Sequence, residues 1–326
     1  MLKRMFAGLS LAALALGFIA SGAAAADKPV YAVLMKTLSN PFWNAMEQGI
    51  KAGAEKAGVD VLVQAVESET ATEAQLNTCN TMLERKPPAL ISSAINPTIL
   101  LPCLKQATDM NILVVDLDFD LDHDIAKKAG VKIAFSIGSD NYAGGGKAAE
   151  WLVSKLGKDA KGPVLVIEGL AGNGNGGKRA HGFADAVVKL APGLSVVGIL
   201  PGDWDRQKAA NITNDILTRN PDLVAIFCSN DTMALGAVEA AYAAGKGDKI
   251  TIIGFDGTTD AVKSIKDGRL GASVAQLPYL VGSQAVEKTK AVLAGGTADE
   301  MTYVPTLVLT KQLFSENKDP LLQYLR

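Results

Sequence analysis

The chain has 326 residues and a formal net charge of −2, with 32 Lys and Arg residues against 34 Asp and Glu residues. It therefore lacks the positive excess by which proteins bind nucleic acids or anionic membrane surfaces. Histidine is scarce, with only His123 and His181, which disfavours a histidine-rich metal site or a Ser-His-Asp hydrolase. The length is sufficient for two domains, each with a core of its own.

The first 26 residues are typical of a secretory signal peptide. Lys3 and Arg4 provide a positive start, Leu9–Ile19 is apolar but too short to span a bilayer comfortably, and Ala24–Ala26 form a small-residue cleavage site. No cysteine lies directly after the apolar stretch, which argues against a lipid anchor. No later stretch is long and apolar enough to span a membrane. We expect a soluble mature chain that begins near Asp27 and is exported into an oxidising compartment.

Short apolar runs alternate with helical segments in the first part of the mature chain. The helical segments include Thr72–Glu84 and Thr98–Asp109. Continuous apolar runs between helices predict an α/β fold, with a parallel sheet that helices cover on both faces. The predicted strands are Val30–Met35, Val59–Ala65, Ala89–Ile95, Ile112–Asp118 and Lys132–Ile137.

The same pattern then starts again, at an offset of roughly 135 residues, which indicates two similar lobes. The break between them is expected at Ser139–Gly146, although the glycine run there also fits close packing at a helix start. Two late runs, Ala272–Gln276 and Tyr303–Thr310, fit either extra edge strands or crossings between the lobes. The strands of the second lobe are Pro163–Glu168, Leu194–Ile199, Leu223–Cys228 and Ile250–Phe255.

The stretch Lys36–Trp43 joins the first strand to a helix over Asn44–Lys56. Asn40 stands where an N-cap belongs, and Pro41 occupies the first helical position, where its missing N–H costs nothing. The turn lies at the carboxyl end of a strand, where ligands bind in open α/β sheets. Phe42 and Trp43 on this turn either cover a ligand or pack the helix onto the sheet.

Polar and aromatic residues follow the strands of both lobes at their carboxyl ends. If both sheets point these ends at one cleft, the residues converge there. Carboxylates accept pairs of hydroxyl hydrogens, Asn, Arg and Lys donate, and aromatic rings cover the C–H faces of a sugar. Two cations balance two carboxylates, which favours an uncharged polyhydroxylated ligand. The residues are Lys36, Asn40, Phe42, Trp43, Asp118, Asn173–Arg179, Trp204, Asn230-Asp231 and Asp256.

Several of these residues have a plainer explanation. Asp118 is also a candidate N-cap for the next helix, and Asp256-Gly257 also fits a simple turn. Asn230-Asp231-Thr232 equally fits a helix start, and we expect Asp231 to serve only there. Trp204 lies in a very polar loop, which indicates that it covers something.

Gly172–Gly177 follows a strand, opens a helix and satisfies G-x-G-x-x-G, the dinucleotide-binding fingerprint. The acid expected after the next strand is not cleanly present, since only Asp203 follows, after a Pro-Gly pair. An exported chain also lacks ready access to soluble NAD. We therefore expect no cofactor, and interpret the loop as one that lets Arg179 reach the cleft.

Three cysteines are present, Cys79, Cys103 and Cys228. Cys79 and Cys103 lie in helical segments on either side of the third strand. Helices on one face of the sheet would allow them to pair, and helices on opposite faces would separate them. Cys228 lies in an apolar strand and is expected to be a small buried hydrophobe. Neither a CxxC motif nor a Cys/His cluster suggests a metal site.

Seven stretches in order carry a resemblance to a known family. They are Lys36–Trp43, Glu168–Gly172, Arg179 with Gly182-Phe183, Asp203–Arg206, Ser229–Gly236, Gly254–Gly257 and Val274–Gln276. Through them the mature chain resembles the periplasmic sugar-binding proteins of bacterial ABC transporters, of the ribose-binding type. It is most similar to the allose-binding members of that family.

The resemblance implies the type I periplasmic binding fold, in which three crossings form a hinge between two lobes. Matching positions place the crossings near Ser139-Asp140, after Gln276 and near Val304-Pro305. Each lobe is then discontinuous in sequence. The expected lobes are residues 27–138 with 277–304, and residues 139–276 with 305–326.

The family's ligand contacts carry over to nine positions of this chain. Two departures from the ribose-binding members bear on the ligand: Lys36 replaces a small hydroxyl residue, and Phe119 replaces an arginine. An allose-like hexose is therefore the favoured ligand, with a pentose, a ketose such as allulose, or a sugar alcohol as alternatives. The nine positions are Asn40, Phe42, Trp43, Asp118, Arg179, Trp204, Asn230, Asp256 and Gln276.

The implied function is capture of a monosaccharide in the periplasm and delivery to an inner-membrane permease. The protein is expected to be a monomer, and a chemoreceptor is a further candidate partner. A sugar-responsive regulator is disfavoured, because a signal peptide stands where a DNA-binding unit would be. An exported sugar-acting enzyme would need a carboxyl with a raised pKa. Lys36 and Arg179 are expected to keep Asp118 and Asp256 ionised, so we expect no enzyme activity.

Overall fold

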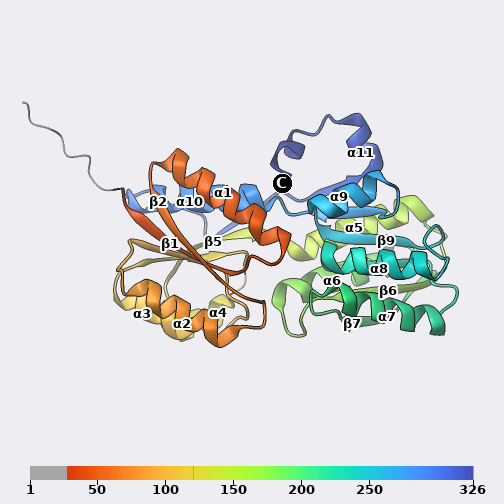
Figure 1. The fold of residues 1–326 in the computed structure, drawn as a ribbon, viewed down its shortest axis with the longest axis horizontal. Coiled ribbons are helices and arrows are strands. Elements are labelled where there is room, and N and C mark those ends of the chain that lie inside the picture. Colours follow the sequence, from red (N-terminus) through yellow and green to blue (C-terminus); the bar gives the residue numbers. More distant parts are fainter. Residues whose placement is uncertain (1–27, 120, 326) are drawn as a thin grey trace, which may run out of the picture.

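The computed structural model describes residues 28–119 and 121–325, so the predicted signal peptide lies outside the described residues. Figure 1 shows two lobes side by side, each built on a six-stranded sheet with helices on both faces. The predicted α/β fold with two similar lobes is therefore confirmed. None of the helices in these two described ranges has the length and apolar character needed to cross a membrane.

The first sheet is parallel throughout. Its strands are buried on both faces because successive side chains of β1 point to opposite sides: Val33 and Met35 enter one apolar cluster, and Leu34 enters another. In sheet order the strands are β11 (Met301–Val304), β5 (Ile133–Ser139), β4 (Leu113–Leu117), β3 (Ala89–Ser92), β1 (Val30–Thr37) and β2 (Asp60–Val66).

The second sheet repeats this order, which confirms the repeat seen in the sequence. Its edge strand β12 is antiparallel to β10, whereas β11 is parallel to β5 in the first sheet. The predicted parallel sheet is formed by the other five strands, and the late run that the sequence left open supplies the antiparallel edge strand. In sheet order the strands are β12 (Leu307–Thr310), β10 (Ala272–Ala275), β9 (Thr251–Asp256), β8 (Ala225–Cys228), β6 (Gly162–Glu168) and β7 (Leu194–Pro201).

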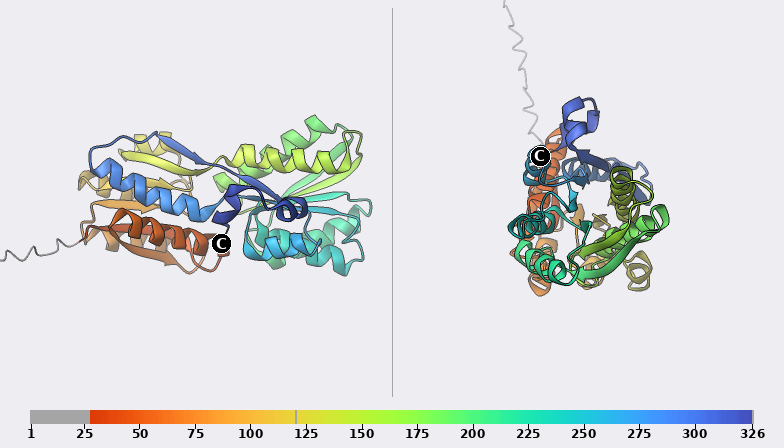
Figure 2. Two further views of the ribbon diagram at one scale, coloured as in Figure 1. Left: turned by 90° about the horizontal axis from the view of Figure 1, so that it is seen from above. Right: turned by 90° about the vertical axis from the view of Figure 1, so that its right-hand side faces the viewer.

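Helices cover both faces of each sheet (Figures 1 and 2). In the first lobe, α1 (Pro41–Ala57) and α10 (Pro278–Leu293) lie side by side on one face. The other face carries α2 (Thr72–Leu83), α3 (Leu101–Asp109) and α4 (His123–Lys128). In the second lobe, one face carries α5 (Asn141–Leu156) and α6 (Gly174–Leu190), and the other carries α7 (Arg206–Arg219), α8 (Asp231–Ala243) and α9 (Thr259–Lys266).

Three connections join the lobes. The chain passes from β5 to α5 after Ser139, from β10 to α10 at Gln276 and Leu277, and from β11 to β12 at Pro305 and Thr306. The run Tyr303–Thr310, predicted as one strand, is thus the end of one strand and the whole of another. Pro305 lacks an N–H and separates them. The exact boundaries of the two lobes stay a prediction.

The end of the chain returns from the second lobe toward the first. After β12 come α11 (Lys311–Glu316) and a 3-10 helix, η1 (Pro320–Tyr324), and the described chain ends near the middle of the molecule in Figure 1. The ring of Tyr324 lies 6.4 Å from that of Tyr279 at the start of α10. Tyr324 and Leu325 also line a small hollow with Phe42, so this segment contacts the first lobe close to the cleft.

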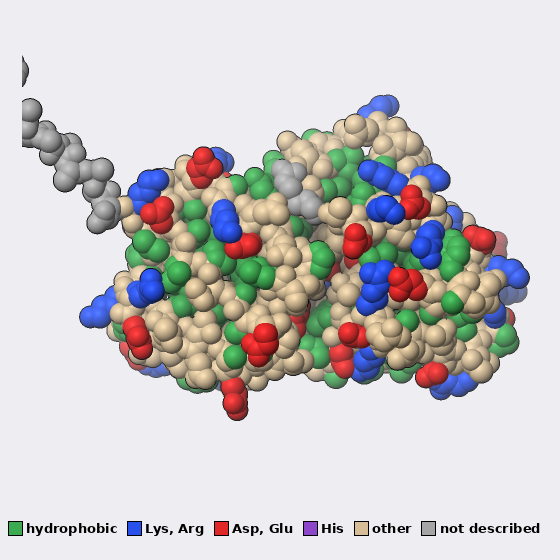
Figure 3. Space-filling view, viewed as in Figure 1, with side chains coloured by type: hydrophobic (Ala, Val, Ile, Leu, Met, Phe, Trp, Pro, Cys, Tyr) green, Lys and Arg blue, Asp and Glu red, His purple; other side chains and the backbone are tan. Residues whose placement is uncertain are grey.

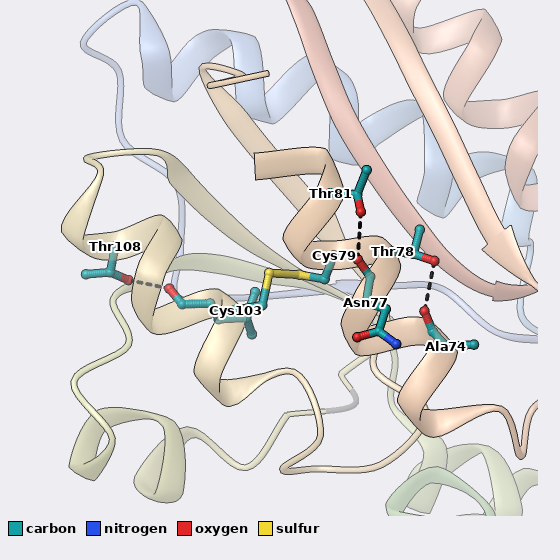
Figure 4. Close-up of a disulfide and its surroundings, with 8 residues drawn as sticks. Ala74, Asn77, Thr78, Cys79, Thr81, Cys103 and Thr108 are labelled. Carbon is teal, nitrogen blue, oxygen red and sulfur yellow. Dashed lines mark hydrogen bonds between the residues drawn. A yellow bond between two sulfur atoms is a disulfide. The ribbon is translucent and has the colours of Figure 1, made fainter. Parts of the chain in front are cut away.

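Cys79 of α2 and Cys103 of α3 form a disulfide (Figure 4). The two helices lie on the same face of the first sheet, which is the arrangement that lets the pair form. Both cysteines are buried in the apolar cluster of that face. A cross-link over 24 residues stabilises a fold by roughly 3 kcal/mol on the chain-entropy estimate. Cys228 is free and buried in β8.

The glycine run Gly144–Gly146 lies inside α5 and does not form a linker. A Cβ on Gly145 would lie 2.2 Å from the carbonyl oxygen of Arg179 in α6, whereas a Cβ on Gly146 would meet nothing within 4 Å. Of the two interpretations of this run, close packing at a helix start is therefore correct.

We predict opposite effects from two neighbouring substitutions in α5. Gly145→Ala should lower the free energy of unfolding by about 1–3 kcal/mol, because the backbones of α5 and α6 would have to separate. Gly146→Ala should raise it by up to about 1 kcal/mol through better helix propensity. Urea unfolding of both variants checks this, and a similar loss in both would contradict the packing argument.

Candidate ligand-binding site

The turn between β1 and α1 is built as the sequence predicts. The side-chain oxygen of Asn40 accepts a hydrogen bond from the backbone N–H of Phe42 at 3.0 Å, and Pro41 is the first helical residue. The rings of Phe42 and Trp43 meet edge to face, 4.9 Å apart. Both are buried in the apolar cluster of the first lobe and also line the cleft, so both interpretations of this pair hold.

Lys36 and Glu69 both interact with Trp43. The Lys36 ammonium lies 5.3 Å from the centroid of the Trp43 ring, a distance at which a cation is attracted to an indole face. Trp43 donates its indole N–H to Oε1 of Glu69 at 2.9 Å. The side chain of Lys36 is buried, and the position of Trp43 is thus fixed by a cation and a carboxylate.

Asp118 follows β4 in a left-handed backbone conformation, with φ of 74°. Its backbone N–H donates to the carbonyl of Ile137 at 2.8 Å, so the residue is still tied to β5. Asp122, not Asp118, caps α4 by accepting from the N–H of Ile125. The N-cap explanation of Asp118 is therefore wrong, and its buried carboxyl faces the cleft.

Arg179 of α6 connects the parts of the second lobe that face the cleft. Its Nε donates to Oδ1 of Asn141 at 2.7 Å, and its Nη1 donates to the carbonyl of Ser229 at 2.9 Å and to Oδ1 of Asp256 at 3.3 Å. The guanidinium also lies 4.4 Å from the centroid of the Phe255 ring. A planar cation with five donors suits such a set of partners.

Asn175, in the first turn of α6, connects the two lobes. Its Nδ2 donates to the backbone carbonyl of Asp118 at 2.7 Å, and its Oδ1 accepts from Nδ2 of Asn141 at 2.9 Å. A chain of hydrogen bonds therefore runs from Asp118 in the first lobe, through Asn175 and Asn141, to Arg179 and Asp256 in the second lobe.

Gln276 lies at the second crossing and donates from Nε2 to Oδ1 of Asp256 at 2.7 Å. Asn230 caps α8 through its side-chain oxygen. Three buried polar atoms around the cleft have no hydrogen-bond partner among the described residues. They are Nε1 of Trp204, Nδ2 of Asn230 and Oε1 of Gln276.

Trp204 packs against two glycines near the G-x-G-x-x-G stretch, Gly169 before it and Gly176 within it. A Cβ on Gly176 would lie 2.9 Å from the Trp204 ring, and a Cβ on Gly169 would lie 2.0 Å from it. Asn173 caps α6, and Arg179 lies further along the same helix, at the cleft. Packing of an indole therefore accounts for Gly176, whereas a Cβ on Gly172, Gly174 or Gly177, the glycines of the motif itself, would meet nothing within 4 Å.

All ten residues predicted as the binding site line one cavity between the lobes, whose empty volume is about 310 Å³. Its position between two lobes, with a lining of aromatic and polar side chains, is typical of a small-molecule site. Asp231 lies outside it and accepts from Ser273 and Thr258, in a role within the second lobe. The lining residues are Lys36, Asn40, Phe42, Trp43, Asp118, Arg179, Trp204, Asn230, Asp256 and Gln276, together with Glu69, Asn173 and Asn175.

Sequence reasoning did not select Glu69, and it named Asn175 only within the range Asn173–Arg179. Glu69 follows the second strand, so the rule that ligands bind at strand ends applies to it as well. An indole N–H at a helix start that needs an acceptor is a further signal for Glu69. Asn175 lies in the Gly/Asn stretch before Arg179, but its bond to Asp118 depends on how the two lobes meet.

Burial changes the ionisation of the two carboxyls in the cavity. It raises the pKa of Asp118 to about 6, although Lys36 and Arg179 act in the opposite direction. It also raises the pKa of Asp256, against the neighbouring guanidinium of Arg179. The two cations therefore do not prevent a rise in the pKa of either carboxyl, because desolvation is the larger effect. Asp118 is still mainly ionised at pH 7.5.

Comparison with known proteins agrees with this architecture. The sequence pattern of the periplasmic binding protein domain matches residues 31–297. The chain belongs to the periplasmic binding protein family. Within it, the chain is 36% identical to the D-allose-binding periplasmic protein of Escherichia coli over 287 residues, which cover 86% of this chain and 92% of the relative.

Solved periplasmic binding proteins have the same fold. An ABC transporter periplasmic solute-binding protein from Actinobacillus succinogenes, with bound D-allose, superimposes with a TM-score of 0.84 at 33% identity. The match covers 89% of this chain and 100% of that one. A solute-binding protein from Agrobacterium vitis, with bound D-fucose, gives a TM-score of 0.82 at 30% identity and covers 91% and 99% of the two chains.

We predict that burial, rather than distance, decides how much an Arg–carboxylate pair stabilises this fold. Arg179→Met should lower the free energy of unfolding by about 3–5 kcal/mol, because it leaves the buried Asp256 without its cation. The exposed pair of Arg206 and Glu239 is closer, at 2.6 Å, yet Arg206→Met should cost less than about 1 kcal/mol. Urea unfolding checks both variants, and equal losses would contradict the prediction.

Proposed function

We propose that this protein is a periplasmic receptor that captures a monosaccharide by closure of its two lobes and delivers it to an ABC permease in the inner membrane. The observation that carries the proposal is the cavity between the lobes. It combines aromatic rings, three carboxyls and two cations with three buried polar atoms that have no partner among the described residues.

The chemistry of these groups suits a sugar. Each hydroxyl both donates and accepts, so sugar hydroxyls would satisfy the free N–H groups of Trp204 and Asn230 as well as the free oxygen of Gln276. Phe42 and Trp43 would cover a C–H face of the ring. Asp118 would accept a hydroxyl hydrogen, and such charge-assisted hydrogen bonds are about twice as strong as neutral ones.

An allose-like hexose is the favoured ligand. The D-allose-binding relative from Escherichia coli and the Actinobacillus succinogenes protein with bound D-allose support this choice. A pentose, a ketose such as allulose, or a sugar alcohol is the alternative within the same transporter class.

Ligand binding is expected to shift the receptor toward the closed form, because ligand held by one lobe gains contacts from the other. The bond between Asn175 and Asp118 would be made only on closure. The hinge would separate residues 27–138 with 277–304 from residues 139–276 with 305–326. Charged side chains of both signs are dispersed over the face in Figure 3, as on a soluble monomer's surface. A chemoreceptor would be a further partner.

The proposed receptor performs no chemical reaction and uses no cofactor. An enzyme acting on the sugar is the rival function, since Asp118 and Asp256 form a pair of carboxyls in the cavity. Incubation of the pure protein with candidate sugars, followed by product analysis, tests this, and turnover would contradict the receptor proposal.

A thermal-shift screen of the mature protein against aldohexoses, pentoses, ketoses and sugar alcohols tests the proposed function. A ligand that binds only the native state raises the melting temperature by mass action, and D-allose should give the largest shift. The screen is repeated after unfolding and refolding, which removes any sugar carried through purification. No shift with any sugar after refolding would contradict the proposal.

We predict that sugar affinity falls as the pH drops through about 6. The pKa of Asp118 is about 6 because burial disfavours its charge, so the carboxylate that accepts hydroxyl hydrogens is present at pH 7.5 and mostly protonated at pH 5. Calorimetric titrations between pH 5 and 8 should show this loss. Asp118→Asn should bind weakly with a flatter pH profile, whereas an unchanged profile in that variant would assign the dependence to another group.

A further inference from the structure

The side chain of Trp43 has three interactions within the protein, in addition to lining the cavity. Phe42 meets it edge to face, the Lys36 ammonium lies over its ring, and Glu69 accepts its indole hydrogen. Glu69 comes from the loop between β2 and α2, far from Trp43 in sequence. This carboxylate therefore fixes the orientation of the indole.

Glu69 also faces the cavity itself. Only its Oε1 is used by Trp43, and Oε2 has no hydrogen-bond partner among residues 28–119 and 121–325. Its charge lies close enough to Asp118 to act on that carboxyl. Glu69 therefore brings a second carboxylate of the first lobe to the cavity, with one oxygen available to a ligand.

A second, larger hollow borders the cavity on the side of Glu69. Its empty volume is about 650 Å³, and the residues that it shares with the cavity are Asn40, Glu69 and Trp204. The first lobe contributes hydroxyls to it from Ser68 and Thr70 on either side of Glu69. The cavity therefore adjoins this hollow at Glu69.

We propose that Glu69 selects hexoses over pentoses. Oε1 holds Trp43 in place, and Oε2 accepts a hydroxyl hydrogen from the hydroxymethyl group that a hexopyranose carries beyond a pentopyranose. D-Allose and D-ribose form a matched pair of probes, since their pyranose forms differ only in this group. The proposal rests on the proposed function, because it concerns a sugar in the same cavity.

Calorimetric titration of Glu69→Gln with D-allose, 6-deoxy-D-allose and D-ribose tests the proposal. Glutamine keeps an oxygen for the Trp43 N–H but removes the charge. The Kd for D-allose should rise about ten- to a hundredfold, which is the loss expected for one charge-assisted hydrogen bond. The Kd values for 6-deoxy-D-allose and D-ribose should each change less than about threefold.

Glu67→Gln is the matched control, because Glu67 is exposed, lies two residues away and does not line the cavity. It should leave all three Kd values unchanged. Equal losses for all three sugars in Glu69→Gln would mean that Glu69 acts only as a structural partner of Trp43, and would overturn the proposal. Unchanged binding of D-allose would overturn it as well.

Trp43→Phe separates the two roles of Glu69. This variant keeps a ring but removes the indole N–H, so a residue that acts only through Trp43 would have no further effect there. In the Trp43→Phe background, Glu69→Gln should still weaken D-allose binding selectively. If the refolded wild-type protein binds neither D-allose nor D-ribose, the proposed function fails too. If it binds them and Glu69→Gln leaves their ratio unchanged, only the Glu69 proposal fails.

Discussion

The burial of one guanidinium, that of Arg179, is the constraint on which the cleft depends. A buried cation is tolerated only when its donors are met, and Asn141, Ser229 and Asp256 meet them from three different elements. The same set fixes the end of β9 against the start of α5. The Nδ2 of Asn141 also donates to Asn175, which in turn donates to the backbone carbonyl of Asp118. Hydrogen bonds therefore link Arg179 to the first lobe.

The backbone around the cavity is strained, which indicates that its geometry is imposed by the fold. Of the nine described residues other than glycine with positive φ, six lie at the cavity or next to one of its residues. Each such conformation costs of order 1–3 kcal/mol and persists only where its surroundings hold it. The part of the cavity wall that each lobe contributes is therefore set by the fold of that lobe, which reduces the ordering that ligand binding requires. The six residues are Asp118, Phe119, Asp203, Trp204, Asp256 and Leu277.

Much of the fold and of the cavity lining could be predicted from the sequence, because strand ends and helix caps are local features. Asn40 and Pro41 mark a helix start wherever the helix packs, and the rule that ligands bind at strand ends requires only the strand order. Glu69 and the contact of Asn175 with Asp118 were not found, because the partners lie in other elements. The direction of β12 could not be predicted either, because it depends on the two-residue connection from β11 and not on the pattern of apolar residues.

The α10 helix and β11 belong to the first sheet's lobe, although most of the second lobe precedes them in the chain. Gly49 and Gly53 of α1 allow α10 to pack closely, since a Cβ on either would collide with the backbone of Tyr279 or Ser283. During synthesis on the ribosome, α1 therefore cannot pack against α10 until nearly the whole chain has been made. A single cut cannot release a complete first lobe, and a free-standing version would need its two segments rejoined by a new linker.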